Sequence, residues 1–184
     1  LELGSEMQLA LAVPAGHAQR VRDMLQPHLD CTRLRFVEGG PSRQESVRRG
    51  LEALVELDPE HVLIHDGARP WVSQELIRRV LAATREHGAC IPVLEPSEAA
   101  KLIGPSGFIL SDLPRHRVKL AQTPQGFLYR RILEAHRRAE GGARLYYDDA
   151  EVYAAFCGPV FTVAGDPANL KITYARDLPR GQPG

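Results

Sequence analysis

Short apolar runs alternate along this chain with segments whose apolar residues recur at helical spacing, and this alternation limits the possible folds more than any other feature. The runs indicate buried strands, and Ser42 and Ser73 stand where helix N-caps are expected. Strands are expected at 9–13, 34–37, 62–64, 90–93, 160–163 and 170–173, and helices at 18–25, 42–55, 73–86, 128–138 and 150–156. Strands alternating with helices predict an α/β fold with a mostly parallel sheet flanked by helices.

One segment breaks the alternation. Between residues 94 and 118 the chain contains three prolines and two glycines, which disfavour regular helix and strand. A segment of this length is predicted to project from the sheet as an arm, over about residues 94–121. The 184 residues otherwise suit one domain, expected over 1–178 and followed by a tail at 179–184.

The charge balance and the cysteines limit the class of protein. The 23 lysines and arginines equal the 23 aspartates and glutamates in number, so the formal net charge is zero. A general nucleic-acid coat or a binder of anionic membranes needs a basic excess, so neither nucleic acid nor membrane is an expected partner. Cys31, Cys90 and Cys157 are far apart and form no CxxC pair, which argues against a disulfide framework or a zinc site and favours the cytoplasm.

Chemistry-bearing side chains follow the expected strand at 62–64 in the run HDGARP. Asp66 offers Mg²⁺ a hard oxygen ligand, Gly67 allows a ligand to approach the backbone closely, and Arg69 offers a bidentate fork for phosphate. Parallel sheets bind ligands beyond the carboxyl ends of their strands, where this run lies. The alternative interpretation is a strand-to-helix turn with a local Asp66–Arg69 pair.

A glycine turn before residue 42 offers a second candidate site. Gly39 and Gly40 precede a helix whose first turn carries Arg43 and Ser46. Backbone N–H groups and the helix dipole at such a start suit an anion or the polar edge of a base. The GK[ST] ending of a P-loop is absent, and the alternative is a plain helix cap.

A single lysine and a basic run are further candidates for binding phosphate. Lys171 lies between two apolar residues of the last expected strand, so it is predicted to face the opposite side, where it can neutralise a phosphate. A solvated lysine on an edge strand is the alternative. In the arm, Arg115, His116, Arg117 and Lys119 form a basic run that on its own indicates solvated surface.

Taken in order, five segments of the chain resemble the 2-C-methyl-D-erythritol 4-phosphate cytidylyltransferase family, which has a Rossmann-like nucleotidyltransferase fold. The segments are GGPSRQESVRRGL, VLIHDGARPWVS, LAQTPQGF, YYDDAEVY and GDPANLKIT, and the match extends over about residues 9–178. The resemblance implies that CTP and 2-C-methyl-D-erythritol 4-phosphate react to 4-diphosphocytidyl-2-C-methyl-D-erythritol and pyrophosphate, in non-mevalonate isoprenoid biosynthesis.

On the nucleotide side, the resemblance assigns Gly40, Arg43 and Ser46 to the loop that holds cytidine, and it places Gly67 beside the ribose. It also implies that Lys171 lies near the α-phosphate and stabilises charge in the transition state. Lys171 and Asp66 are therefore the expected catalytic residues.

On the acceptor side, the resemblance places Asp66 near Mg²⁺ and the substrate hydroxyls, so Asp66 is the expected metal ligand and Mg²⁺ the expected cofactor. Arg69 and Thr123 match substrate-site residues. In the family the arm dimerises, and the resemblance implies that Arg115 reaches the methylerythritol phosphate bound by the other subunit. CTP, a polyol phosphate and a second copy of the chain are thus the expected partners.

The sequence also departs from the family. Members of the family begin with a strand and a glycine-rich loop that wraps the triphosphate. Neither is present in this sequence, so we expect its N-terminus to be incomplete. The usual Asp-Thr-x-Lys stretch is replaced at 95–101, Tyr147 stands where a threonine is usual, and Pro41 stands where an acidic residue often lies.

Two other functions remain open at the level of sequence. Ribitol-5-phosphate cytidylyltransferase has the same fold and nucleotide, and its acceptor is also a short polyol phosphate. A non-catalytic nucleotide-binding or dimeric scaffold is the alternative from another class. The retention of Asp66, Arg69, Thr123 and Lys171 argues against the scaffold, because a scaffold has no need of all four.

Overall fold

The computed structural model describes residues 7–142 and 144–178, so the expectations for residues 1–4 and for the tail at 179–184 lie outside the described residues. Internal contacts divide the chain into two compact units. The first comprises Leu1–Val62 and Phe127–Val160, and the second comprises Leu63–Gly126 and Phe161–Gly184. The boundaries fall within β3 (His61–Ile64) and β8 (Gln125–Leu128). A single domain over 1–178 stays a prediction.

The first unit contains a β–α–β crossover. β1 (Leu9–Val13) and β2 (Leu34–Glu38) pair in parallel, in register from Leu9↔Leu34 to Val13↔Glu38, and α1 (Ala18–Leu25) connects them. Parallel neighbours need a crossover of this kind because each strand must begin at the same edge. The register leaves both carboxyl ends level. Directly beyond β2, the Gly39 N–H donates to the Val13 carbonyl at 2.7 Å.

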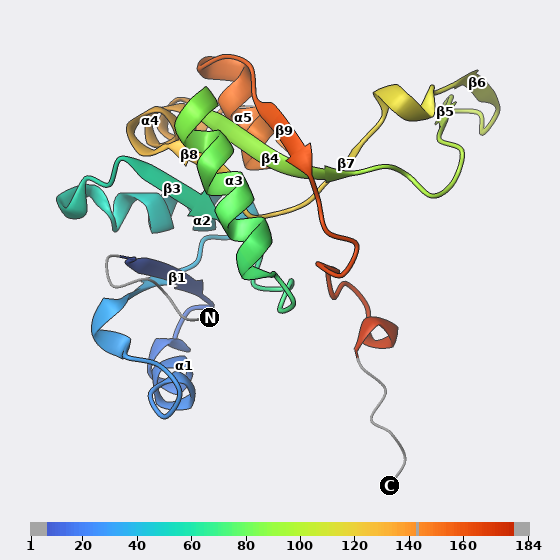
Figure 1. Cartoon of the computed structure of the whole chain (residues 1–184). Coiled ribbons are helices and arrows are strands. Elements are labelled where there is room, and N and C mark those ends of the chain that lie inside the picture. The colour runs from blue at the N-terminus through green and yellow to red at the C-terminus, as the bar shows by residue number, and fades with distance from the viewer. Residues whose placement is uncertain (1–6, 143, 179–184) are drawn as a thin grey trace, which may run out of the picture. The chain divides into compact units, whose positions relative to one another are not determined.

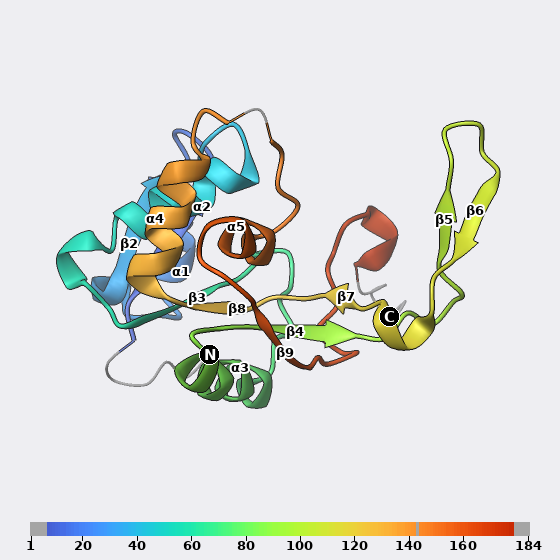
Figure 2. The same ribbon diagram turned by 90° about the horizontal axis from the view of Figure 1, so that it is seen from above.

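Three further helices pack within the same unit. α2 (Arg43–Glu52) contacts β1 and α4 (Tyr129–Ala139), and α4 contacts α5 (Asp149–Phe156), which lies beside it in Figure 2. The Tyr129 hydroxyl donates to the Leu51 carbonyl at 2.8 Å, which satisfies both groups in the core. The buried apolar residues of this unit include Val13, Leu34, Leu51, Leu54, Phe127, Tyr129, Ile132, Leu133, Val152 and Tyr153.

The second unit is organised around a five-stranded sheet. The strand order is β3-β8-β4-β7, and β9 (Phe161–Ala164) also pairs with β4 (Ala89–Leu94). β9 runs parallel to β4, whereas the short β7 (Leu120–Ala121) runs antiparallel to it. α3 (Gln74–His87) packs on β4 and β9, as Figure 1 shows for β4. Its N-cap Ser73 accepts the Leu76 N–H, as the sequence predicted.

The segment that follows β4 forms a separate hairpin. β5 (Lys101–Ile103) and β6 (Ile109–Asp112) pair antiparallel, and a 3₁₀ turn at Arg115–Arg117 leads on to β7. Figure 2 shows the hairpin standing apart from β4 and β7. The hairpin lies within the arm expected over 94–121, which stays a prediction. Neither strand was predicted, because each has only three or four residues between prolines and glycines.

The α/β class with a mostly parallel sheet is confirmed, and two elements differ from the prediction. β8 was not expected, because its four residues between Pro124 and α4 show no alternation. The strand expected at 170–173 is wrong. The Asn169 N–H bonds to the Asp166 carbonyl and the Leu170 N–H to the Ala168 carbonyl, so the backbone turns here instead of entering a ladder.

None of the helices in the described ranges is long and apolar enough to cross a membrane.

Gly126 in β8 provides a test of packing in the second unit. A Cβ added at Gly126 would collide with Thr84 Oγ1 and lie 3.0 Å from Leu63 Cδ2. Thr84 is fully buried, and its hydroxyl donates to the Val80 carbonyl at 2.7 Å, so its side chain has little room to move. Gly126→Ala is therefore expected to lower the free energy of unfolding by about 2 kcal/mol, as measured by urea denaturation.

Gly50 in α2 is the matched control, because a Cβ there meets no atom within 4 Å. Gly50→Ala is expected to raise the free energy of unfolding by about 0.5 kcal/mol, since alanine favours the helix interior. If the two alanine variants were equally stable, steric collision at Gly126 would not be the reason for its glycine.

Candidate functional site

Two cations approach the Asp66 carboxylate at the carboxyl end of β3, in the second unit. The Lys171 Nζ lies 3.0 Å from Asp66 Oδ2, and the Arg69 Nε lies 3.9 Å from the same oxygen. Asp66 and Arg69 side chains are only 13% and 11% exposed, whereas Lys171 is 45% exposed. The structure thus brings together three residues that the sequence predicted. Lys171 is the cation that can turn toward an incoming anion.

A threonine and a histidine support the Asp66 backbone. The Asp66 N–H donates to Thr123 Oγ1 at 3.0 Å, and Thr123 Oγ1 lies 2.9 Å from His65 Nδ1. His65 Nε2 lies 3.0 Å from the Arg69 carbonyl, which only accepts. Nε2 therefore carries the hydrogen, and the Thr123 hydroxyl donates to Nδ1. Desolvation of the ring lowers the pKa of His65, which favours this neutral form.

Arg69 connects two segments that lie far apart in the sequence. Its Nη1 donates to the Asn169 carbonyl at 2.8 Å, so part of its guanidinium fork is already occupied. Its Nε is buried and has no hydrogen-bond partner in the described part of the chain. Desolvation lowers the pKa of Arg69, although an arginine keeps its charge in a protein. The phosphate contact expected of Arg69 stays a prediction.

Two buried amide side chains hold the segment that carries Lys171. Gln122 accepts the Asp166 N–H at 3.0 Å, and its amide donates to the carbonyls of Asp166 and Asn169 at 3.0 and 3.2 Å. Asn169 in turn donates to the Thr123 carbonyl at 2.7 Å. These contacts fix residues 166–169 against residues 122–123 without a strand ladder.

Gly67 has an open environment within its own unit. A Cβ added there would meet no atom within 4 Å, and Gly67 is not among the glycines with positive φ. Neither packing nor backbone conformation requires glycine at this position. The space in front of its backbone is compatible with the expected ligand approach, and its place beside the ribose stays a prediction.

In the first unit, the glycine turn after β2 borders a pocket of about 540 Å³. The turn is internally fixed. The Gly40 N–H donates to Ser46 Oγ at 3.0 Å, and the Ser46 hydroxyl donates to the Ser42 carbonyl at 2.9 Å. A Cβ at Gly39 would lie 3.3 Å from the Val13 carbonyl oxygen, so close strand packing favours glycine there. The pocket is lined by Ala12, Val13, Pro14, Ala15, Gly39, Gly40, Pro41 and Ser46.

Arg43 begins α2, and Ser42 caps it by accepting the Glu45 N–H at 3.1 Å, as predicted. The Arg43 Nη2 lies 2.8 Å from Asp149 Oδ2 at the start of α5. The helix cap, which was the alternative interpretation of this segment, is therefore present. The pocket and the arginine held by Asp149 are present as well.

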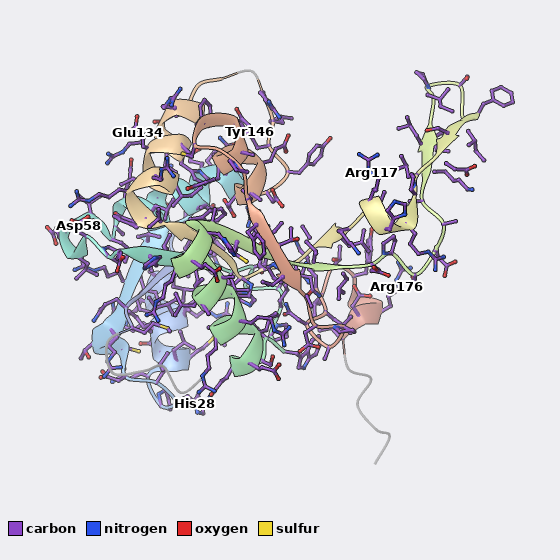
Figure 3. The ribbon with its side chains drawn as sticks, turned by 45° about the horizontal axis from the view of Figure 1, so that its top comes forward. His28, Asp58, Arg117, Glu134, Tyr146 and Arg176 are labelled. Atoms are coloured by element: carbon purple, nitrogen blue, oxygen red, sulfur yellow. The ribbon has the colours of Figure 1, made fainter. Side chains whose placement is uncertain are left out.

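Arg115 lies on the exposed 3₁₀ turn of the arm. Figure 3 labels Arg117, two residues further along the same turn. This turn lies within residues 94–121, and the action of Arg115 on a second subunit stays a prediction.

Five polar residues that hold the Asp66 and Arg43 regions in place were assigned no role from the sequence. His65 lies inside the HDGARP run, so its position was the available signal. The others are buried polar residues, whose partners lie far away in the sequence. The missed residues are His65, Gln122, His136, Asp149 and Asn169.

The fit of Mg²⁺ can be judged from the carboxylates. Across residues 7–142 and 144–178, no group of three His, Cys, Asp or Glu side chains is placed to hold a metal ion. Mg²⁺ commonly binds through one or two carboxylates together with substrate phosphates and waters. The single carboxylate of Asp66 is compatible with a site of this kind, and Mg²⁺ as the cofactor stays a prediction.

Comparisons with known proteins agree on one family. The family model described as "IspD: 2-C-methyl-D-erythritol 4-phosphate cytidylyltransferase" matches residues 4–182. A curated relative, the bifunctional enzyme IspD/IspF of Chelativorans, is 44% identical over 146 residues, which are 79% of this chain and 36% of the relative. The chain thus spans little more than a third of the length of this relative.

Solved structures support the same fold. A 4-diphosphocytidyl-2C-methyl-D-erythritol synthase from Anaerococcus prevotii superimposes with a TM-score of 0.84 at 29% identity, covering 92% of this chain and 74% of that one. A 2-C-methyl-D-erythritol 4-phosphate cytidylyltransferase from Thermus thermophilus gives a TM-score of 0.77 at 35% identity, covering 92% of this chain and 78% of that one.

Proposed function

Because the chain belongs to the 2-C-methyl-D-erythritol 4-phosphate cytidylyltransferase family, we propose that it transfers the cytidylyl group of CTP to 2-C-methyl-D-erythritol 4-phosphate. The products are 4-diphosphocytidyl-2-C-methyl-D-erythritol and pyrophosphate, an early step in making isoprenoid precursors. The observation that carries the proposal is the approach of Lys171 and Arg69 to Asp66 at the carboxyl end of β3.

The reaction needs charge neutralisation more than covalent chemistry. An oxygen of the acceptor phosphate forms a bond to the α-phosphorus of CTP, and the bond from that phosphorus to the pyrophosphate oxygen breaks. Such in-line transfers depend on positioning and on electrostatic stabilisation of the phosphoryl oxygens. Lys171 is suited to this task because its side chain is half exposed and held by an ion pair that it can exchange for a phosphate.

Asp66 serves the phosphates in a second way. A Mg²⁺ ion bound there would neutralise the triphosphate and help pyrophosphate to leave. Thr123 and His65 hold the Asp66 backbone, so the carboxylate is presented from a fixed position. We assign Arg69 and Thr123 to the acceptor at the same strand end, where the contacts already described hold both side chains in place.

On the nucleotide side, we assign the pocket at the glycine turn to cytidine. Ser46 occupies the Gly40 N–H and so maintains the shape of the turn, while Arg43 provides a cation at the first position of α2. Gly67 leaves its backbone accessible for the ribose. These roles form part of the proposal.

Lys171→Ala in the full-length protein is expected to lower kcat by about 100-fold or more, because it removes a cation that acts on the transition state. Its side chain is 45% exposed and forms one surface ion pair, so the free energy of unfolding should change by less than about 1 kcal/mol. Steady-state kinetics and urea denaturation of the same preparation measure both quantities.

Arg130→Ala is the matched control. Arg130 also forms an exposed ion pair with a carboxylate, that of Asp58, but it lies on α4 in the first unit and outside the arm. Its turnover should stay near that of the unchanged protein. Near-normal kcat in Lys171→Ala, or an equal loss in both variants, would reject the transition-state role.

The acceptor is tested by measuring CTP-dependent release of pyrophosphate with two polyol phosphates. The family model and the named structures favour methylerythritol phosphate, so kcat/KM is expected to be much higher with it than with ribitol 5-phosphate. A preference for ribitol 5-phosphate would replace the proposed substrate. No release with either acceptor from the full-length protein would favour the non-catalytic scaffold.

We also propose that the arm forms a homodimer in the cytoplasm. The hairpin presents Leu102, Ile103, Phe108, Ile109 and Leu110, whose exposed fractions range from 49% to 75%. The gathering of several exposed apolar residues in one short hairpin favours a protein partner. The three cysteines are free thiols in the structure, which is compatible with a reducing compartment.

Mixed dimers test whether Arg115 acts on the neighbouring site. Arg115→Ala and Lys171→Ala chains are each expected to be poorly active alone. If Arg115 acts in trans, a mixed dimer regains one intact site, so an equimolar mixture should recover about a quarter of the original turnover. Mixing two separately folded, Lys171→Ala preparations is the control. No recovery after verified subunit exchange would show that the arm does not complete the partner's site.

A further inference from the structure

We propose that Asp149 is a positioning residue that orients the Arg43 guanidinium toward the nucleotide, and that His136 holds the Asp149 carboxylate in turn. The inference rests on the proposed function, because it takes the pocket at the glycine turn as the nucleotide site. All three residues belong to the first unit, on α2, α5 and α4.

The pair between Arg43 and Asp149 joins the beginnings of two helices. Arg43 is the first residue of α2 and Asp149 the first residue of α5, 106 positions further along the chain. Their Nη2–Oδ2 distance is 2.8 Å, which is short enough for a charge-assisted hydrogen bond. The Asp149 side chain is 1% exposed and that of Arg43 is 37% exposed. One partner is therefore fixed in the interior, while the other extends to the surface.

His136 completes the arrangement from the opposite oxygen. Its Nε2 lies 3.1 Å from Asp149 Oδ1, and its side chain is fully buried in α4. A carboxylate only accepts, so Nε2 carries the hydrogen. With a separate donor on each oxygen, the plane of the Asp149 carboxylate is set, and with it the direction in which Arg43 is held.

Helix stability alone does not account for this arrangement. Replacing a buried ion pair by apolar residues is often neutral or stabilising, so its presence is weak evidence for a role in stability. α2 already has a Ser42 cap and further pairs, such as Arg48 with Glu140 at 2.7 Å. The pair with Asp149 differs from these in its location, at the first position of α2 directly after the glycine turn.

The position of Arg43 is close in sequence to the pocket at the glycine turn. Gly39, Gly40, Pro41 and Ser46 line it, and Arg43 lies between the last two in the sequence. An arginine has five N–H donors in a rigid plane, which suits the carbonyl, hydroxyl or phosphate oxygens of a nucleotide. If Asp149 orders the guanidinium before the nucleotide arrives, less side-chain entropy is lost on binding.

Asp149→Asn tests the inference, because it keeps the size of the side chain and removes the charge. The KM for CTP is expected to rise about tenfold, while kcat and the KM for the acceptor change by less than about twofold. Glu140→Gln is the control, since it removes a partner of the same helix away from the glycine turn. Equal KM values for CTP in the two variants would overturn the proposal.

A double-mutant cycle separates positioning from general destabilisation. In an Arg43→Met background, Asp149→Asn should add no further increase in the KM for CTP, because Asp149 acts through Arg43. It should also restore part of the stability lost by Arg43→Met, since a buried carboxylate is no longer left without its cation. A further rise in KM in the double variant would show that Asp149 acts by another route.

The side chain of Arg43 can also be followed without turnover. In ¹⁵N NMR spectra, its guanidinium signals should be resolved in the original protein and averaged in Asp149→Asn, but not in Glu140→Gln. Unchanged signals in Asp149→Asn would reject positioning whether or not the enzyme is active. Absence of CTP turnover in the unchanged protein would instead reject the proposed function, and this spectrum would still decide the contact.

Discussion

The clamp formed by Gln122 and Asn169 is the interaction on which the site in the second unit depends. Residues 166–171 have no strand ladder, so their backbone groups need other partners. The Gln122 amide bonds to the Asp166 N–H and to the carbonyls of Asp166 and Asn169, and the Arg69 guanidinium also donates to the Asn169 carbonyl. The Asn169 amide anchors the segment by donating to the Thr123 carbonyl. Together with the Ile172 N–H, which donates to the Ala68 carbonyl at 2.8 Å, these contacts set the position of Lys171 relative to Asp66. A buried amide can replace a strand here because it offers a donor and an acceptor at a fixed separation.

A net charge of zero gives no indication of how the charges are arranged. In the second unit Lys171 and Arg69 approach one acid, and in the first unit Arg43 begins a helix beside a pocket. Elsewhere the charges pair across the surface, as in Arg130 with Asp58 and Lys119 with Glu95. Exposed pairs of that kind contribute little to stability. The local placement of the cations, and not the net charge of the chain, therefore makes these two places suitable for an anionic ligand.

Periodicity and local motifs allowed much of the fold to be predicted. The strands β1 to β4 and the caps Ser42 and Ser73 follow from residues close in sequence, and so did the chemical character of Asp66, Arg69 and Lys171. Lys171 was identified although its expected strand is absent, because the resemblance to the family, and not the strand alternation, assigned it to the α-phosphate. Local signals were therefore sufficient for residue type but not for backbone geometry at residues 170–173.

The contacts that hold the site could not be obtained in the same way. Gln122 and Asp166 are 44 positions apart and Arg43 and Asp149 are 106, so no local pattern relates them. A buried polar residue such as His136 also carries no periodic signal, because polar residues are ordinarily expected at the surface. The role of such a residue can be assigned only when its hydrogen-bond partners are known.

Each unit contains one acid–base pair, and the two pairs differ in a way that matches their proposed tasks. Lys171 is a flexible point charge, half exposed and held by Asp66, so it can leave its partner for a phosphate at little cost. Arg43 is a planar group whose partner Asp149 is buried and bonded on both oxygens, so separating them would leave an unpaired charge in the interior. The same chemistry thus gives a mobile cation at the proposed site of charge development and a fixed cation at the proposed site of nucleotide recognition. Whether the cation is mobile or fixed depends on how exposed it is and on whether it is a lysine or an arginine.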